Sequence, residues 1–92
     1  MTEWPESVPV LTAKDMWAGN YVNEDGTKRC LMGWMRGLGL DEETYLEGHE
    51  ALARAIGSPY IATWNDSHTP QERADAWNAA MRSLGYTEVI DG

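Results

Sequence analysis

The segment from Asp41 to Gly57 constrains the fold most, because its sequence marks both ends of an α-helix. Asp41 offers the side-chain acceptor favoured at a helix N-cap, and Gly57 can adopt the left-handed conformation that commonly ends a helix. This pattern predicts a mainly helical domain. Between the two ends, apolar residues and one histidine share one arc of the predicted helix: Tyr45, Leu46, His49, Leu52, Ala53 and Ile56.

A second well-marked helix is predicted to begin after Thr69. Thr69 and Glu72 form a capping-box pattern, and Pro70 takes the first helical position, where its missing N–H costs no hydrogen bond. Gly85 marks the C-terminal end. A buried stripe at helical spacing runs along the segment: Ala74, Trp77, Met81 and Leu84.

Three shorter segments have weaker patterns. Residues 12–19 begin with a capping-box-like sequence and predict a helix of about two turns. Residues 30–38 have helical apolar spacing, although Gly33, Gly37 and the following Gly39 weaken a helix. Residues 60–64 fit either one helical turn or a strand, and Asn65 and Asp66 are expected to end that segment by folding back on their own backbone.

Two other regions favour β-structure. Residues 23–26 contain Asp-Gly, a sequence typical of a tight hairpin turn, and predict a β-hairpin between residues 20–22 and 27–29. Residues 86–90 also have β character, so they are expected to pair with the N-terminal segment or with the hairpin.

The predicted fold class is mainly α, of the α+β type, with four to five short helices, a small β-hairpin and room for a short terminal strand pairing. Prolines keep residues 1–11 extended, so we expect an N-terminal arm followed by a single compact domain over residues 12–90. The five tryptophans, in a chain without phenylalanine, are expected to fill most of the core.

The chain is acidic, with a formal net charge of -8. A phosphate backbone would be repelled, so we expect no direct nucleic-acid binding and favour a protein partner with a basic surface, including a nucleoprotein complex. Cys30 is the single cysteine, which excludes an internal disulfide and favours a reducing compartment. Neither a signal sequence nor a long apolar run is present, so we expect no membrane contact and a cytoplasmic location.

Five of the 15 acidic residues fall within ten positions, without a basic residue among them. Three of them, Glu43, Glu47 and Glu50, lie opposite the apolar arc of the helix, where they could imitate a row of phosphates and occupy a basic groove. The alternative is an ordinary solvated helix face whose first acids complement the helix dipole. The predicted partner-binding residues are Asp41, Glu42, Glu43, Glu47 and Glu50.

The residue types of a thiol-dependent enzyme are present at scattered positions. Cys30 as nucleophile, His49 or His68 as base and Asp66 as orienting group would suit a small hydrolase or transferase. Alternatively, Cys30 is a small buried apolar residue and His49 is structural. One cysteine and two histidines lack the paired spacing of zinc ligands, so we predict no metal and no cofactor.

Three short motifs, Asp25-Gly26, Arg29-Cys-Leu-Met-Gly33 and Ile61-Ala-Thr-Trp-Asn-Asp66, occur in an order that resembles a family of small bacterial and phage proteins of uncharacterised activity. The family has a hairpin ending at such an Arg/Cys segment, then a helix, then a Trp-Asn-Asp turn before a final helix. The resemblance spans residues 13–84. It implies this fold and a mobile-element origin, and it brings no activity with it.

We therefore predict a non-enzymatic, acidic protein-binding module. A phage or mobile-element inhibitor of the anti-CRISPR kind, occupying a basic nucleic-acid-binding surface of a defence complex in the host cytoplasm, fits this description. One alternative is the small thiol-dependent hydrolase or transferase using Cys30. The other is a homodimer or larger structural homo-oligomer, because five tryptophans and five methionines exceed what one small core hides.

Overall fold

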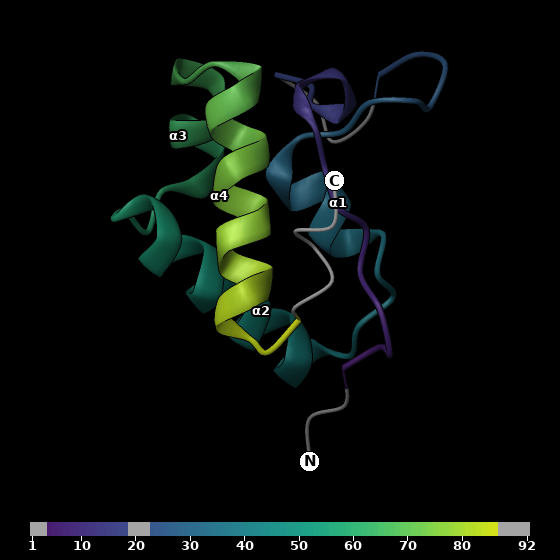
Figure 1. Cartoon of the computed structure of the whole chain (residues 1–92), viewed down its shortest axis with the longest axis vertical. Coiled ribbons are helices and arrows are strands. Elements are labelled where there is room, and N and C mark those ends of the chain that lie inside the picture. The colour runs from purple at the N-terminus through teal and green to yellow at the C-terminus, as the bar shows by residue number, and fades with distance from the viewer. Residues whose placement is uncertain (1–3, 19–22, 87–92) are drawn as a thin grey trace.

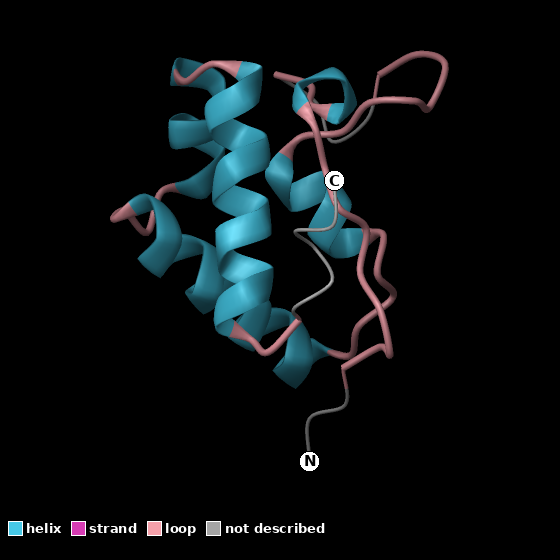
Figure 2. Cartoon of the chain, in the orientation of Figure 1, coloured by secondary structure: helices cyan, strands magenta, loops and turns pink. Residues whose placement is uncertain are grey.

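The computed structural model describes residues 4–18 and 23–86, which form four α-helices and one short 3-10 turn (Figures 1 and 2). The mainly helical part of the predicted fold class is confirmed, and the described residues contain no strand. The elements in chain order are η1 (Ala13–Asp15), α1 (Leu31–Arg36), α2 (Glu42–Ile56), α3 (Ile61–Ser67) and α4 (Pro70–Ser83).

Helix α4 is the central element of the fold. It packs against α2 and η1, while α1 contacts both α2 and α3. Figure 1 shows α4 running vertically through the molecule, with α3 on one side and α1 on the other. None of the helices in the described part of the chain has both the length and the apolar character needed to cross a membrane.

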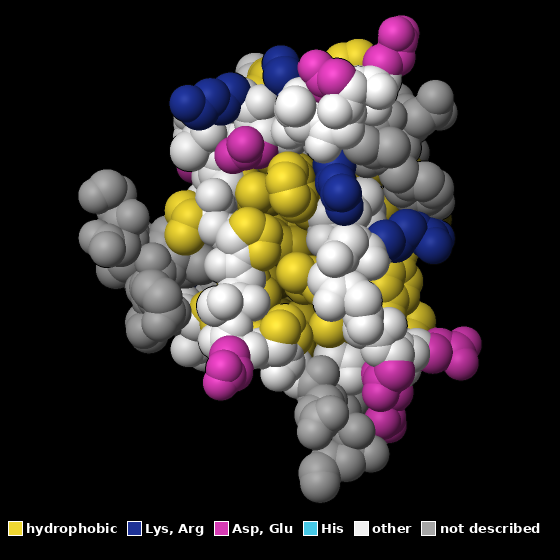
Figure 3. Space-filling view, turned by 90° about the vertical axis from the view of Figure 1, so that its right-hand side faces the viewer, with side chains coloured by type: hydrophobic (Ala, Val, Ile, Leu, Met, Phe, Trp, Pro, Cys, Tyr) yellow, Lys and Arg dark blue, Asp and Glu magenta, His cyan; other side chains and the backbone are white. Residues whose placement is uncertain are grey.

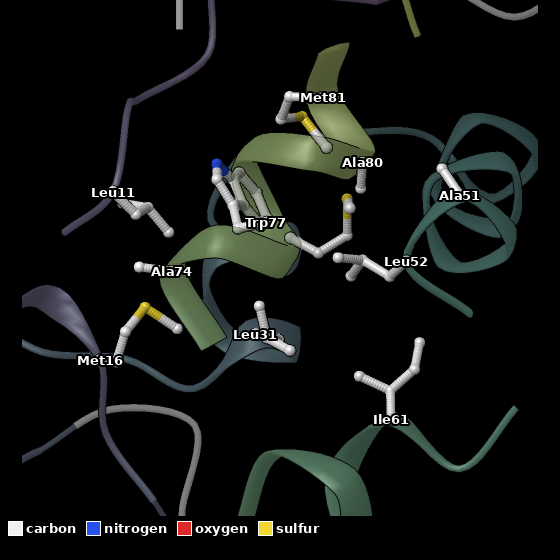
Figure 4. Packing of buried hydrophobic residues seen from close by; sticks show 11 residues of the cluster. Leu11, Met16, Leu31, Ala51, Leu52, Ile61, Ala74, Trp77, Ala80 and Met81 are labelled. Atoms are coloured by element: carbon white, nitrogen blue, oxygen red, sulfur yellow. The ribbon is translucent and has the colours of Figure 1, made fainter. Parts of the chain in front are cut away.

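Leucine, methionine and alanine side chains make up most of the core, around one tryptophan. Trp77 on α4 has no exposed surface, and Figure 4 shows it between Leu11 on one side and Leu52 on the other. Three other tryptophans, Trp4, Trp34 and Trp64, are partly buried and pack against this cluster, whereas Trp17 is 37% exposed. The core therefore depends less on tryptophan than the composition predicted.

The N-terminal arm, described here over residues 4–11, is fastened to α4 by side chains that bond its backbone. The Trp77 indole N–H donates to the carbonyl of Pro9 at 2.9 Å. The Asn78 amide accepts from the N–H of Leu11 at 3.1 Å and donates to the carbonyl of Leu11 at 2.9 Å. This pairing satisfies the backbone of an extended segment without a strand, and it brings Leu11 into the core, where it is 3% exposed.

Helices α2 and α4 begin and end where their local sequences predict. The Asp41 carboxylate accepts from the N–H of Thr44 at 2.8 Å, and Gly57 ends α2 in the left-handed region at φ 71°. At the start of α4, the Glu72 N–H donates to the Thr69 hydroxyl and the Thr69 N–H donates to the Glu72 carboxylate. These capping contacts satisfy backbone groups that lack partners within a helix.

The buried face of α2 differs from the predicted apolar arc. Leu46, predicted to be buried, is 60% exposed, and small residues face the core instead. A Cβ added at Gly48 would lie 2.6 Å from the sulfur of Met35, so this glycine permits the close approach of α1. The face of α2 that carries small residues is turned toward the core, because the neighbouring helices lie on that side. The buried residues of α2 are Thr44, Gly48, Ala51 and Leu52.

The predicted β-hairpin over residues 20–29 is not supported. A turn does form, because the N–H of Asn23 donates to the carbonyl of Lys28 at 3.0 Å. However, Arg29 makes an isolated parallel bridge with Met16, so its partner is the segment after η1. The first predicted strand lies outside the described residues.

Near the ends of the chain, one prediction is corrected by the structure and the other falls almost entirely outside the described residues. The helix predicted over residues 12–19 is reduced to η1, because the carbonyl of Asp15 accepts from the N–H of Arg29 at 3.0 Å and the chain turns extended at Met16. The predicted strand at residues 86–90 falls, except for its first residue, outside the described residues.

Of residues 60–64, which fitted a helical turn or a strand, Tyr60 is the N-cap of α3 and the other four form its start. The helix continues past Asn65, so the prediction that this residue ends the segment is wrong. Asn65 is 1% exposed; its Oδ1 accepts from the N–H of Leu31 at 3.1 Å, and its Nδ2 donates to the carbonyl of Trp17 at 3.1 Å. One buried amide thus joins three segments of the chain.

Candidate functional site

The five predicted partner-binding residues lie on α2 or at its N-cap, and all five are exposed. Three of them, Glu43, Glu47 and Glu50, are turned away from the buried face and fall within about 60° of one another at about 100° per residue. These three residues are called the acidic ridge below. Their carboxylates stand on a helix whose other side is fixed by the core.

Glu47 and Glu50 of the acidic ridge contact other side chains of the molecule. The indole N–H of Trp4 donates to the Glu47 carboxylate at 2.6 Å, which ties the N-terminal arm to α2. Glu50 pairs with Arg54 at 3.0 Å, and both side chains are largely exposed. Water screens such an exposed pair, so it adds little stability and can exchange partners.

Asp41 differs from the ridge because it caps the helix. Hydrogen bonds from the Thr44 side chain and backbone N–H lower the pKa of the Asp41 carboxyl from its ordinary value of 3.8. Stabilisation of a charged group in the folded state is lost once that group is protonated. The stability of α2 is therefore expected to fall when acid protonates the Asp41 carboxylate.

Replacing Asp41 with asparagine is expected to weaken the dependence of stability on acid pH. Because the folded-state pKa is lowered, the charged cap stabilises the folded chain above the unfolded value of 3.8, and this contribution is lost as the pH falls through the folded value. Asparagine caps a helix about as well and does not titrate. Urea unfolding at neutral pH and at about pH 3 measures the difference.

The alanine variant of Asp41 is the control for this experiment. It removes the cap at every pH, so it should be less stable than the asparagine variant at neutral pH. Equal acid-induced losses in the wild type and in Asp41→Asn would contradict a role for the charge.

The candidate catalytic residues make local structural contacts or lie half-buried on a helix. Cys30 is 6% exposed and caps α1, where its sulfur accepts from the N–H of Gly33 at 3.3 Å. The ring of His68 stacks on Trp64 with centroids 3.9 Å apart, and its Nδ1 lies 2.7 Å from the Trp64 carbonyl oxygen. His49 is half-buried on α2.

These residues lie on different elements: Cys30 at the N-cap of α1, His49 on α2, Asp66 on α3 and His68 at the C-cap of α3. Within the described ranges, no group of three or more His, Cys, Asp or Glu side chains could hold a metal ion. Asp66 is exposed on α3, whereas Cys30 is buried at the start of α1. Cys30 and His68 are engaged in the local contacts given above.

A groove that the sequence did not predict lies among α1, α2 and the start of α3. Tyr60 on its edge is 72% exposed, and the groove has a volume of about 280 Å³. Leu46, 60% exposed, lies three positions before His49 on α2 and therefore on a neighbouring part of the same helix surface. The groove is lined by Met32, His49, Pro59, Tyr60, Ile61, Ala62 and Thr63.

The face of the molecule that carries α1 and the arm has another character. Figure 3 shows hydrophobic side chains gathered across the middle of this face, with Lys, Arg, Asp and Glu side chains around them. Charges of both signs are interspersed here. The strongest grouping of like charge is the acidic one on α2.

Together these features define a class: a small, acidic, mainly helical domain with carboxylates aligned on one helix and an apolar groove beside that helix. No family model, curated protein or solved structure matches the chain. The resemblance to small bacterial and phage proteins therefore stays a prediction, and function is argued from the site itself.

Proposed function

We propose that this protein is a non-enzymatic binding module that uses the outer surface of α2 to occupy a basic surface on a protein partner. The observation that carries the proposal is the acidic ridge, three exposed carboxylates on a helix whose caps and core contacts fix it in place. Binding through a preformed helix avoids the entropy cost of ordering a segment on contact.

Electrostatics defines the partner. The net charge of -8 opposes direct contact with nucleic acid and attracts a surface rich in Lys and Arg. A surface built to hold phosphates is such a surface. The proposed setting is an inhibitor from a phage or mobile element that covers the nucleic-acid-binding surface of a host defence complex, because aligned carboxylates can take the places of phosphates.

The contacts within the ridge agree with this role. The Trp4 indole fixes the Glu47 carboxylate, so that side chain loses little freedom on binding. Arg54 is exposed beside Glu50, and a partner guanidinium can replace it there. The ridge therefore has one carboxylate that is already positioned and one that can exchange its cation.

Reversing the ridge to Glu43→Lys, Glu47→Lys and Glu50→Lys is expected to slow association at low salt by about tenfold or more, because steering charge is lost. The same change should flatten the salt dependence. The measurement is the association rate on immobilised, nucleic-acid-free defence complexes at low and high salt.

A second triple variant controls for net charge. Glu6→Lys, Glu24→Lys and Asp75→Lys change exposed acids on the arm, the turn and α4 by the same total charge. This control should slow association less than the ridge reversal does. Equal slowing by both variants would assign the effect to net charge alone, and failure of the wild type to bind any complex would remove the defence setting.

A further inference from the structure

We propose that the groove among α1, α2 and α3 is the specificity pocket of the binding surface, and that it receives an apolar side chain from a basic segment of the partner. This inference rests on the proposed function, because the groove adjoins α2, the helix that carries the acidic ridge. The ridge would attract the partner, whereas the groove would decide which basic segment stays bound.

The edge of the groove is held in place by local hydrogen bonds. The N–H of Tyr60 donates to the Ser58 hydroxyl at 3.1 Å, and the Tyr60 carbonyl accepts from the N–H of Trp64 at 3.0 Å. The backbone on both sides of this residue is thus fixed while its ring stays 72% exposed. A tyrosine with a fixed backbone offers a large contact area and loses little freedom when it binds.

The size of the groove suits one or two side chains. Its volume of about 280 Å³ is below the range of about 300–1,000 Å³ typical of small-molecule pockets. Met32 and Ile61 contribute apolar surface to its lining. Exposed apolar residues are ordinary when single. Here Tyr60 lines the groove, and Leu46, which is outside the lining, is exposed one helical turn before the lining residue His49.

Charge decides what occupies the groove. Leu46 stands four residues after Glu42 and four before Glu50, so both exposed acids are its neighbours on the helix surface. The groove lining itself contains no carboxylate, so Lys or Arg beside an apolar side chain in the groove would be attracted to these two acids on the neighbouring surface of α2. A second copy of the chain would instead bring another net charge of -8 toward the same surface.

The test uses designed peptides as probes. One amphipathic peptide of about 14 residues contains leucine and lysine at helical spacing. The control peptide has serine in place of leucine and carries the same charge. Calorimetric titration compares the wild type with Leu46→Ser and Tyr60→Ser, both changed at exposed positions. Val10→Ser is the matched control, because Val10 is an exposed apolar residue on the N-terminal arm.

The leucine peptide is expected to bind the wild type more tightly than the serine peptide does. Leu46→Ser and Tyr60→Ser should each raise its dissociation constant about tenfold without altering the salt dependence, whereas Val10→Ser should leave it within about twofold. Thermal melting confirms that each variant is folded.

Several outcomes would overturn the inference. These are equal affinity for the two peptides, no binding of the leucine peptide, or unchanged affinity in both groove variants. A wild-type dimer that Leu46→Ser dissociates, seen by light scattering, would assign the groove to a second copy instead. The proposed function fails separately, when ridge reversal leaves association and its salt dependence unchanged.

Discussion

Replacing Asn65 with alanine is expected to lower the free energy of unfolding by about 2–4 kcal/mol, because a buried backbone N–H and a part-buried carbonyl lose their partners together. The amide lies 3.1 Å from both the nitrogen of Leu31 and the carbonyl oxygen of Trp17, and the residue is 1% exposed. Urea unfolding followed by tryptophan fluorescence measures the change.

Two further variants locate the cause of that loss. Thr63→Ala changes an exposed residue on the same helix and should stay within about 0.5 kcal/mol of the wild type. Asn65→Asp keeps the acceptor for Leu31 but removes the donor to Trp17. A buried aspartate has a raised folded-state pKa. The Asn65→Asp variant should therefore be most stable in acid and lose stability as the pH rises through that pKa.

One result would contradict the prediction for Asn65. If Asn65→Ala were no less stable than Thr63→Ala, the amide would not join α3 to α1 and to the segment before the turn. Because both bonds reach across the sequence, their loss should affect unfolding of the whole domain and not of α3 alone.

Replacing Trp77 with alanine is expected to cost about 3–5 kcal/mol, the range for removing a buried aromatic side chain. Trp77 has no exposed surface and lies at the centre of α4, the helix that contacts α2 and η1. The loss compares with a total stability of about 5–14 kcal/mol for a chain of this length, so the variant should be partly unfolded when warm.

Trp77→Phe separates packing from hydrogen bonding. It retains most of the apolar volume and removes the donor to the carbonyl of Pro9, so it should cost less than the alanine variant and weaken the attachment of the arm. Faster proteolysis of the N-terminal arm would report that release. Trp17→Ala, at a 37% exposed tryptophan, should cost much less; a loss equal to that of Trp77→Ala would contradict the assigned core.

The arm also connects the core to the candidate site. Trp77 and Asn78 bond the arm near its end, and Trp4 at its start donates to Glu47 on the acidic ridge. Release of the arm is therefore expected to free Glu47 as well. Stability at α4 and the geometry of the ridge are linked through one extended segment.

The exposed half of the candidate site was predictable from the sequence, and the groove was not. The outward position of Glu43 and Glu50 follows from helical periodicity once α2 is recognised. Leu46 was assigned to the buried arc because a hydrophobic pattern does not say where the neighbouring helices lie. Gly48 brings α1 close on another side of α2, and this leaves Leu46 in solvent.

The sequence by itself determined where α2 and α4 begin and end, because caps such as Asp41 with Thr44 join residues only a few positions apart. Tertiary structure alone decided the role of Asn65, which bonds residues 34 and 48 positions away, and the docking of the arm on Asn78, 67 positions away. Such contacts leave no local pattern, since either partner is an ordinary polar or backbone group until folding brings the two together.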